Sequence, residues 1–165
     1  MRRWLLLLVL LAGCGGSRPV TYAPVDTTAV APPFSLTLLD GKQVDSASLW
    51  KRRPVVVLFF ASWCSKCAQQ QDALAKVLDD YGDAVDVVGI AGQDTPDAVK
   101  AWADEHHADY PVGIDPDLAT WRRYAVRTPP AVVLVAPGGK LFRGWPGGVD
   151  AETLNDALGQ IVNRG

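Results

Sequence analysis

Two of the three cysteines in this 165-residue chain, Cys64 and Cys67, stand three residues apart in the segment FFASWCSKCAQQQ. Two thiols at this spacing are suited to exchanging a disulfide with another protein, to supplying half of a metal site, or to closing a small structural loop. A purely structural disulfide is poorly supported, because closing so short a loop removes little entropy from the unfolded chain.

A zinc site would need two more ligands, because structural zinc is almost always four-coordinate. The only histidines, His106 and His107, are adjacent, so on a helix their side chains would point about 100° apart. A second C-x-x-C is absent from the sequence. We therefore expect no metal and no other cofactor. Binding of Cu(I) by the two thiols alone stays open as an alternative, since thiolates are soft ligands.

A buried strand and an amphipathic helix are predicted on either side of Cys64. Residues 54–60, PVVVLFF, form a continuous apolar run rich in β-branched and aromatic side chains, which is typical of a strand buried on both faces. A helical period follows, and Gly82 is well placed to end the helix. The positions that repeat with this period are Cys67, Leu74, Val77, Leu78 and Tyr81.

This placement predicts different chemistry for the two thiols. Cys64 would lie at the carboxyl end of the strand and the amino end of the helix, where open α/β sheets place their sites. Unpaired backbone N–H groups and the helix dipole favour a thiolate there, and the thiolate is the form that attacks a disulfide. Cys67 would lie one turn further in and be more shielded, so it suits the role of resolving thiol.

The alternation of strands and helices continues to the end of the chain. Further strands are predicted at residues 34–39, 43–44, 85–91, 131–135 and 140–145, and further helices at residues 96–106 and 115–124. A last helix, capped by Asp150, would bury Leu154, Ala157, Leu158, Ile161 and Val162. This order predicts an α/β fold whose sheet is covered by helices on both faces.

The first residues of the chain have the layout of a secretory signal. Arg2 and Arg3 precede the apolar run 4–12, which as a helix would span only about 14 Å of a hydrocarbon core roughly 30 Å thick. The sequence LAGC that ends at Cys14 resembles the lipobox of bacterial lipoproteins, in which the chain is cut before the cysteine and the cysteine is lipidated. A plain signal peptide with a free or disulfide-bonded Cys14 is the alternative.

Three segments follow from this interpretation: a lipoprotein signal peptide over 1–13, a lipidated flexible tether over 14–33, and one domain over 34–165. The tether is rich in Pro, Thr and Ala and shows no helical or strand period. Removal of Arg2 and Arg3 would change the net charge from −2 to −4, so nothing suggests a nucleic acid partner. We expect a monomer.

Several segments resemble, in order, the landmarks of the TlpA/ResA-like group of membrane-tethered thioredoxin-like thiol-disulfide oxidoreductases. They are PPFSLTLLDGKQV, VVVLFFASWCSKC, VDVVGIA, RRYAVRTPPAVVLV and GGKLFRG, and the resemblance covers residues 32 to 163. It implies a thioredoxin-like fold with a mixed central sheet. Pro130 follows Cys67 by 63 positions, which leaves room for one extra helix and strand before a cis-proline.

The resemblance also implies roles for individual residues. Cys64 would be the attacking cysteine, Cys67 the resolving one, and Trp63 the aromatic residue before the nucleophile. Pro130 would be the cis-proline that faces the disulfide, and Pro129 stands where the family often has threonine. A cis-proline presents neighbouring backbone groups to an extended substrate without offering an N–H of its own.

The chain departs from the family at positions close to the thiols. Leu58 occupies the thioredoxin position for a buried aspartate, and Gln70 the position at which many members of the group carry a glutamate. Between the cysteines stand Ser65 and Lys66. Lys66 either stabilises the Cys64 thiolate by its charge, which would make the disulfide more oxidising, or is merely solvated.

The resemblance as a whole implies an extracytoplasmic thiol-disulfide oxidoreductase, lipid-anchored to a bacterial membrane in the cell envelope. Its partners would be protein thiols and disulfides and a redox partner protein, reached through mixed disulfides. A peroxiredoxin-like peroxidase is a further alternative, but that family needs a threonine three residues before its cysteine, where Ala61 precedes Cys64.

Overall fold

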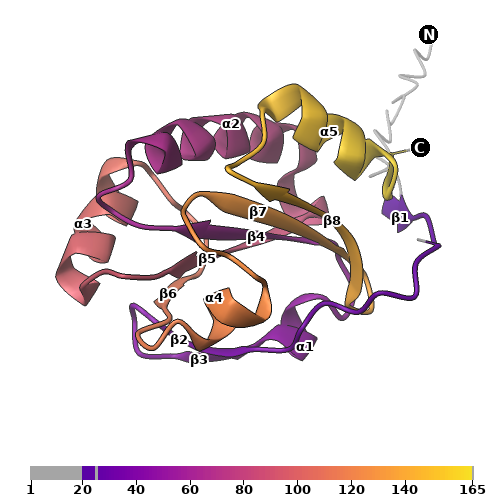
Figure 1. The fold of residues 1–165 in the computed structure, drawn as a ribbon. Coiled ribbons are helices and arrows are strands. Elements are labelled where there is room, and N and C mark those ends of the chain that lie inside the picture. The colour runs from indigo at the N-terminus through magenta and orange to yellow at the C-terminus, as the bar shows by residue number, and fades with distance from the viewer. Residues whose placement is uncertain (1–19, 25, 165) are drawn as a thin grey trace, which may run out of the picture.

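The computed structural model describes residues 20–24 and 26–164, and its main feature is a seven-stranded sheet (Figure 1). The strand order across this sheet is β3-β2-β6-β5-β4-β7-β8. The strands are β2 (Ser35–Leu38), β3 (Gln43–Asp45), β4 (Val55–Phe60), β5 (Asp86–Ala91), β6 (Val112–Ile114), β7 (Ala131–Ala136) and β8 (Lys140–Pro146).

The sheet is mixed, as the resemblance implied. β5 pairs in parallel with β4 and with β6, whereas β4 pairs antiparallel with β7, and the pairs at both edges are also antiparallel. All residues of β4 and β7 are buried. Both strands are buried on their two faces because helices cover both sides of the sheet.

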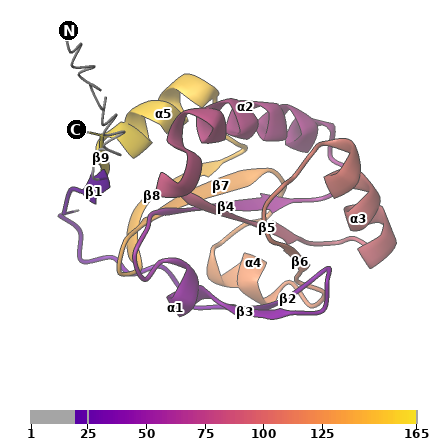
Figure 2. The ribbon, with the colours of Figure 1, turned by 180° about the vertical axis from the view of Figure 1, so that it is seen from behind.

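Helices α2 (Ser65–Tyr81), α3 (Pro96–Glu105) and α5 (Ala151–Gly159) cover one face, and α1 (Ser46–Leu49) and α4 (Ala119–Arg123) cover the other (Figures 1 and 2). A short 3₁₀ turn, Gly82–Ala84, follows α2. Alternate residues of β4 divide between two cores: Leu58 and Phe60 face α2, whereas Phe59 faces α4. The predicted α/β, thioredoxin-like class is confirmed.

Local signals set several boundaries where the sequence predicted them. Gly82 ends α2 with a positive φ of 50°, which glycine adopts without a steric penalty. Thr95 caps α3 by accepting a hydrogen bond from the backbone N–H of Ala98, and Pro96 begins the helix. α3 and β6 are the extra helix and strand, and they lie between β5 and β7.

Two predicted helix boundaries are wrong. α4 begins at Ala119 rather than at residue 115, because the buried Asp115 carboxylate accepts a hydrogen bond from the backbone N–H of Trp121 at 2.8 Å and Leu118 adopts a positive φ. α5 ends at Gly159, so Ile161 and the residues after it are not helical. Ile161 and Val162 are buried nonetheless. β9 (Val162–Arg164) pairs with β1 (Val20–Tyr22) in a second, two-stranded sheet.

The expectation of a free tether is wrong for the part of 14–33 that the structure describes. Besides the β1–β9 pairing, the backbone N–H of Ala23 donates to the carbonyl of Ile161 at 2.7 Å, and the N–H of Ala31 donates to the carbonyl of Gly139 at 2.9 Å. The signal peptide and Cys14 lie outside the described residues. Within the described part, no helix is long and apolar enough to span a membrane.

Candidate active site

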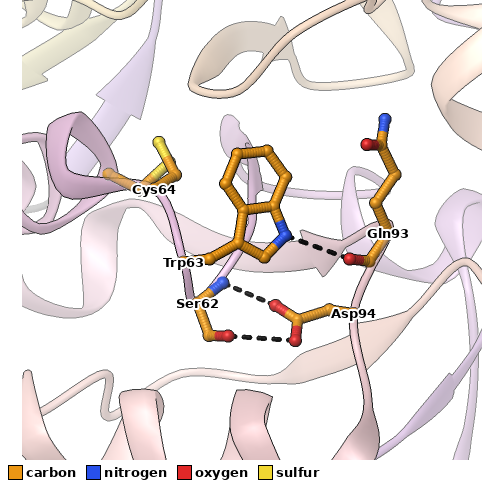
Figure 3. The surroundings of a disulfide bond; sticks show 6 residues. Ser62, Trp63, Cys64, Gln93 and Asp94 are labelled. Carbon is orange, nitrogen blue, oxygen red and sulfur yellow. Dashed lines mark hydrogen bonds between the residues drawn. A yellow bond between two sulfur atoms is a disulfide. The ribbon is translucent and has the colours of Figure 1, made fainter.

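Cys64 and Cys67 form a disulfide at the junction of β4 and α2, with their Cα atoms 5.3 Å apart (Figure 3). Cys64 is the N-cap residue of α2. The backbone N–H of Cys67 donates to the Cys64 carbonyl at 2.9 Å, so the disulfide spans the first helical turn. The orphan N–H groups and the dipole of a 17-residue helix are thus directed at Cys64, which favours its thiolate once the disulfide opens.

The two cysteines differ in their access to solvent. Cys64 is 8% exposed, whereas Cys67 is fully buried at 0%. An incoming thiolate must approach a sulfur in line with the bond that it breaks, so access decides which sulfur is attacked. In this geometry only Cys64 is open to a partner.

A second loop holds the segment just before Cys64. One carboxylate oxygen of Asp94 accepts from the backbone N–H of Ser62 at 2.5 Å, and the other accepts from the Ser62 hydroxyl at 2.9 Å (Figure 3). Beside this clasp, Trp63 Nε1 donates to the Gln93 carbonyl at 3.0 Å. The loop after β5 therefore fixes the backbone and the indole that precede the nucleophile.

Sequence reasoning missed the Ser62–Asp94 clasp. A usable signal for it exists in the sequence. Asp94 follows β5 and Ser62 follows β4, and the carboxyl ends of adjacent parallel strands meet at one edge of a sheet. The indole of Trp63 is 59% exposed and so offers an apolar surface beside Cys64.

Two of the remaining predicted site residues, Lys66 and Pro130, line a groove of about 710 Å³. The peptide bond between Pro129 and Pro130 is cis, at the position that the resemblance indicates, and Pro130 is buried. Lys66 lines the α2 side of the groove and Trp145 the β8 side. Ser65 and Lys66 are exposed, and Pro129 is half-buried.

Neither family position near the thiols carries an acid. Leu58 is fully buried among apolar side chains. Gln70 is buried as well, and its Oε1 accepts from the backbone N–H of Val149 at 2.7 Å. Asp72 is exposed on α2. Across the described residues, no cluster of three or more His, Cys, Asp or Glu side chains could hold a metal ion.

A thioredoxin-like fold whose C-x-x-C pair forms a disulfide at the start of α2 defines the class of thiol-disulfide oxidoreductases. The comparisons with known proteins agree. Residues 27–143 match the model of the AhpC/TSA family, so the chain belongs to that family.

Known relatives support the same activity. The chain is 30% identical over 125 residues to the thioredoxin-like protein YneN of Bacillus subtilis, with 70% of this chain and 73% of the relative covered. It is 24% identical to the thiol-disulfide oxidoreductase ResA of Bacillus thuringiensis, over 97% of this chain and 95% of the relative. The prediction of a thiol-disulfide oxidoreductase is confirmed.

Solved structures share the fold. A secreted Mycobacterium tuberculosis disulfide oxidoreductase, described as homologous to Escherichia coli DsbE, superposes with a TM-score of 0.68 and 26% identity. The match covers 76% of this chain and 93% of that chain. The similarity therefore extends over nearly the whole of the compared enzyme.

Proposed function

We propose that the protein exchanges its Cys64–Cys67 pair with partner proteins through a mixed disulfide on Cys64, outside the cytoplasm and anchored to a bacterial membrane by lipid on Cys14. The observation that carries the exchange mechanism is the difference in burial between Cys64, at 8% exposed, and Cys67, at 0%. The solvent-accessible sulfur of Cys64 can attack or be attacked by a partner, whereas the buried sulfur of Cys67 can only resolve the mixed disulfide.

When the reduced protein meets a partner disulfide, the Cys64 thiolate attacks one partner sulfur and the other partner sulfur leaves as a thiolate. Cys67 then attacks Cys64, which closes the Cys64–Cys67 disulfide and releases the partner's remaining sulfur. Run backwards, the same steps oxidise a partner dithiol. The direction follows from the reduction potential of the pair relative to that of the partner.

The surface around Cys64 suits an extended polypeptide. The exposed indole of Trp63 supplies an apolar contact next to Cys64, and Lys66, two residues after Cys64, lines a groove together with Pro130. Ser65, directly after Cys64, is exposed, and Pro129, directly before Pro130, is half-buried. We assign the partner's cysteine to this strip, with Pro130 beside the attacked sulfur.

The proposed anchor would hold the redox site away from the membrane. The Tyr22 hydroxyl of β1 donates to the carbonyl of Ala84, at the end of the molecule where α2 finishes, whereas Cys64 lies where α2 begins. Val20 is only six positions after Cys14, a stretch that at full extension spans about 20 Å. This short link joins the anchor to the end of the domain opposite Cys64, so Cys64 would face away from the membrane. The secreted relative supports a site outside the cytoplasm.

Trapping of mixed disulfides tests the assignment of roles. In Cys67→Ser no thiol remains to resolve the adduct, so partner proteins should accumulate on Cys64 and appear as reducible bands on non-reducing gels. The matched variant Cys64→Ser should trap far fewer, because Cys67 is closed off. Equal trapping by the two variants would show that the roles are wrongly assigned.

A further inference from the structure

The carboxamide of Gln70 is a buried polar group that disulfide exchange, as described above, leaves unused. Gln70 is only 5% exposed, and its Nε2 has no hydrogen-bond partner among the residues that the structure describes. The Val149 N–H donates to the other end of the carboxamide at 2.7 Å, which identifies that end as the oxygen. The amino group, with two hydrogens to donate, is therefore left without an acceptor while the disulfide is closed.

Buried donors without acceptors are rare, because each forfeits the hydrogen bonds that it makes with water in the unfolded chain. Such a donor is explained if an acceptor forms in another state of the protein. The acceptor must itself be buried, since Nε2 is closed off from solvent and from a docked partner. It must also appear when the disulfide opens.

The sulfur of Cys67 meets both requirements. Cys67 and Gln70 are three residues apart on α2, so they share one face of the helix, and both are buried. Long helical side chains lean back toward the preceding turn, which brings the Gln70 carboxamide toward Cys67. The carboxamide also lies beside Pro130: a Cβ atom on Gly148 would fall 2.6 Å from Gln70 Oε1 and 3.2 Å from Pro130 Cγ.

We propose that Gln70 Nε2 donates a hydrogen bond to the Cys67 sulfur whenever that sulfur carries a negative charge during exchange. The inference deepens the proposed function and rests on the resolving role of Cys67. Gln70 acts here as a positioning and electrostatic residue rather than as a base, because an amide neither takes up nor releases a proton at neutral pH.

The charge on Cys67 arises in both directions of the reaction. In resolution, the Cys67 thiol gives its proton to solvent and the thiolate attacks Cys64 Sγ. The Cys64–Cys67 bond forms, the bond from Cys64 to the partner sulfur breaks, and that sulfur leaves with the electron pair and takes up a proton. In the reverse reaction a partner thiolate attacks Cys64, and Cys67 is the leaving group. A fixed donor beside a closed-off sulfur stabilises the charge in either case.

The test is a titration of the Cys67 thiolate by its ultraviolet absorbance in the full chain carrying Cys64→Ser. Subtracting the absorbance of Cys64→Ser/Cys67→Ser cancels the contribution of Cys14. Gln70→Met removes the donor and the acceptor together, whereas Gln70→Glu keeps the acceptor for the Val149 N–H and removes the donor once the glutamate is ionised. Gln69→Met makes the same change at an exposed neighbour on α2 and serves as the control.

Both Gln70 variants should raise the midpoint of the Cys67 titration by about one pH unit or more, a tenfold change in thiolate formation. Gln70→Glu should raise it further than Gln70→Met, since its carboxylate also repels the thiolate. Gln69→Met should leave the midpoint unchanged.

A midpoint in Gln70→Glu that matches that of the natural glutamine would overturn the proposal. So would a loss of stability in Gln70→Met without a change of midpoint, because Gln70 would then be only structural. If Gln70→Met does not fold, an unchanged midpoint in Gln70→Glu would still overturn the proposal. The titration uses no partner protein, so its failure is distinct from a failure of the trapping experiment.

Discussion

The clasp between Asp94 and Ser62 predicts a measurable cost when the carboxylate is replaced by an amide. In Asp94→Asn one of the two oxygens becomes an NH₂ group and must face a donor. If the nitrogen replaces Oδ2, it faces the backbone N–H of Ser62. If it replaces Oδ1, it faces both the Ser62 hydroxyl and the backbone N–H of Thr95, whose nitrogen lies 2.9 Å from Oδ1. Neither orientation keeps all three hydrogen bonds.

The magnitude follows from the better of these two orientations. Placing the NH₂ group against the Ser62 N–H loses one hydrogen bond to a charged acceptor, worth about 1.5–3 kcal/mol, at a half-buried site. We expect Asp94→Asn to lower the free energy of unfolding by about 2 kcal/mol, which for a domain of this size lowers Tm by about 4–8 °C. Ser62→Ala removes only the hydroxyl contact and should cost about 1 kcal/mol.

Urea unfolding of the oxidised protein, followed by circular dichroism, measures these differences. Asp109→Asn, at an exposed loop residue, is the matched control and should stay within about 0.5 kcal/mol of the natural protein. If Asp94→Asn also stays within that range, the clasp does not stabilise the loop. The reasoning that Asp94 holds the backbone before Cys64 would then fail.

Three further outcomes are expected. Lys66→Ala should raise the pKa of Cys64 and lower the reduction potential by about 10 mV, since a solvated charge contact is worth under about 1 kcal/mol; alkylation rates that do not change across the pH range would show that Lys66 is merely solvated. Cys14→Ser should release the protein from membranes or leave the signal uncleaved, as measured by membrane fractionation and acyl-chain labelling. Unchanged membrane retention and unchanged labelling in this variant would exclude the anchor. Hydrogen bonds from Thr153 hold the pKa of the Asp150 carboxyl below its usual 3.8. The destabilisation of Asp150→Ala should therefore be full above about pH 4 and shrink as the pH falls through the lowered pKa, and thermal melts that show no such dependence would contradict this.

The sequence by itself determined the chemistry and its immediate setting. The apolar run of β4, the helical period after Cys64 and the glycine at residue 82 are local patterns, each interpreted from residues within a few positions of one another. Such patterns place a C-x-x-C pair at the start of a helix without knowledge of the rest of the chain. They also failed at Asp115, whose carboxylate accepts a hydrogen bond from the backbone of Trp121, six residues further on, so that the helix begins later than predicted.

Only the tertiary structure decided how the site is held. The side chain of Asp94 hydrogen-bonds to Ser62, 32 residues away in the sequence, and that of Gln70 hydrogen-bonds to Val149, 79 residues away. β1 meets β9 from the opposite end of the chain. These pairings depend on which strands lie side by side and on the direction in which each side chain points. Local propensity and periodicity carry no information on that arrangement, because it arises from packing the whole sheet against its helices.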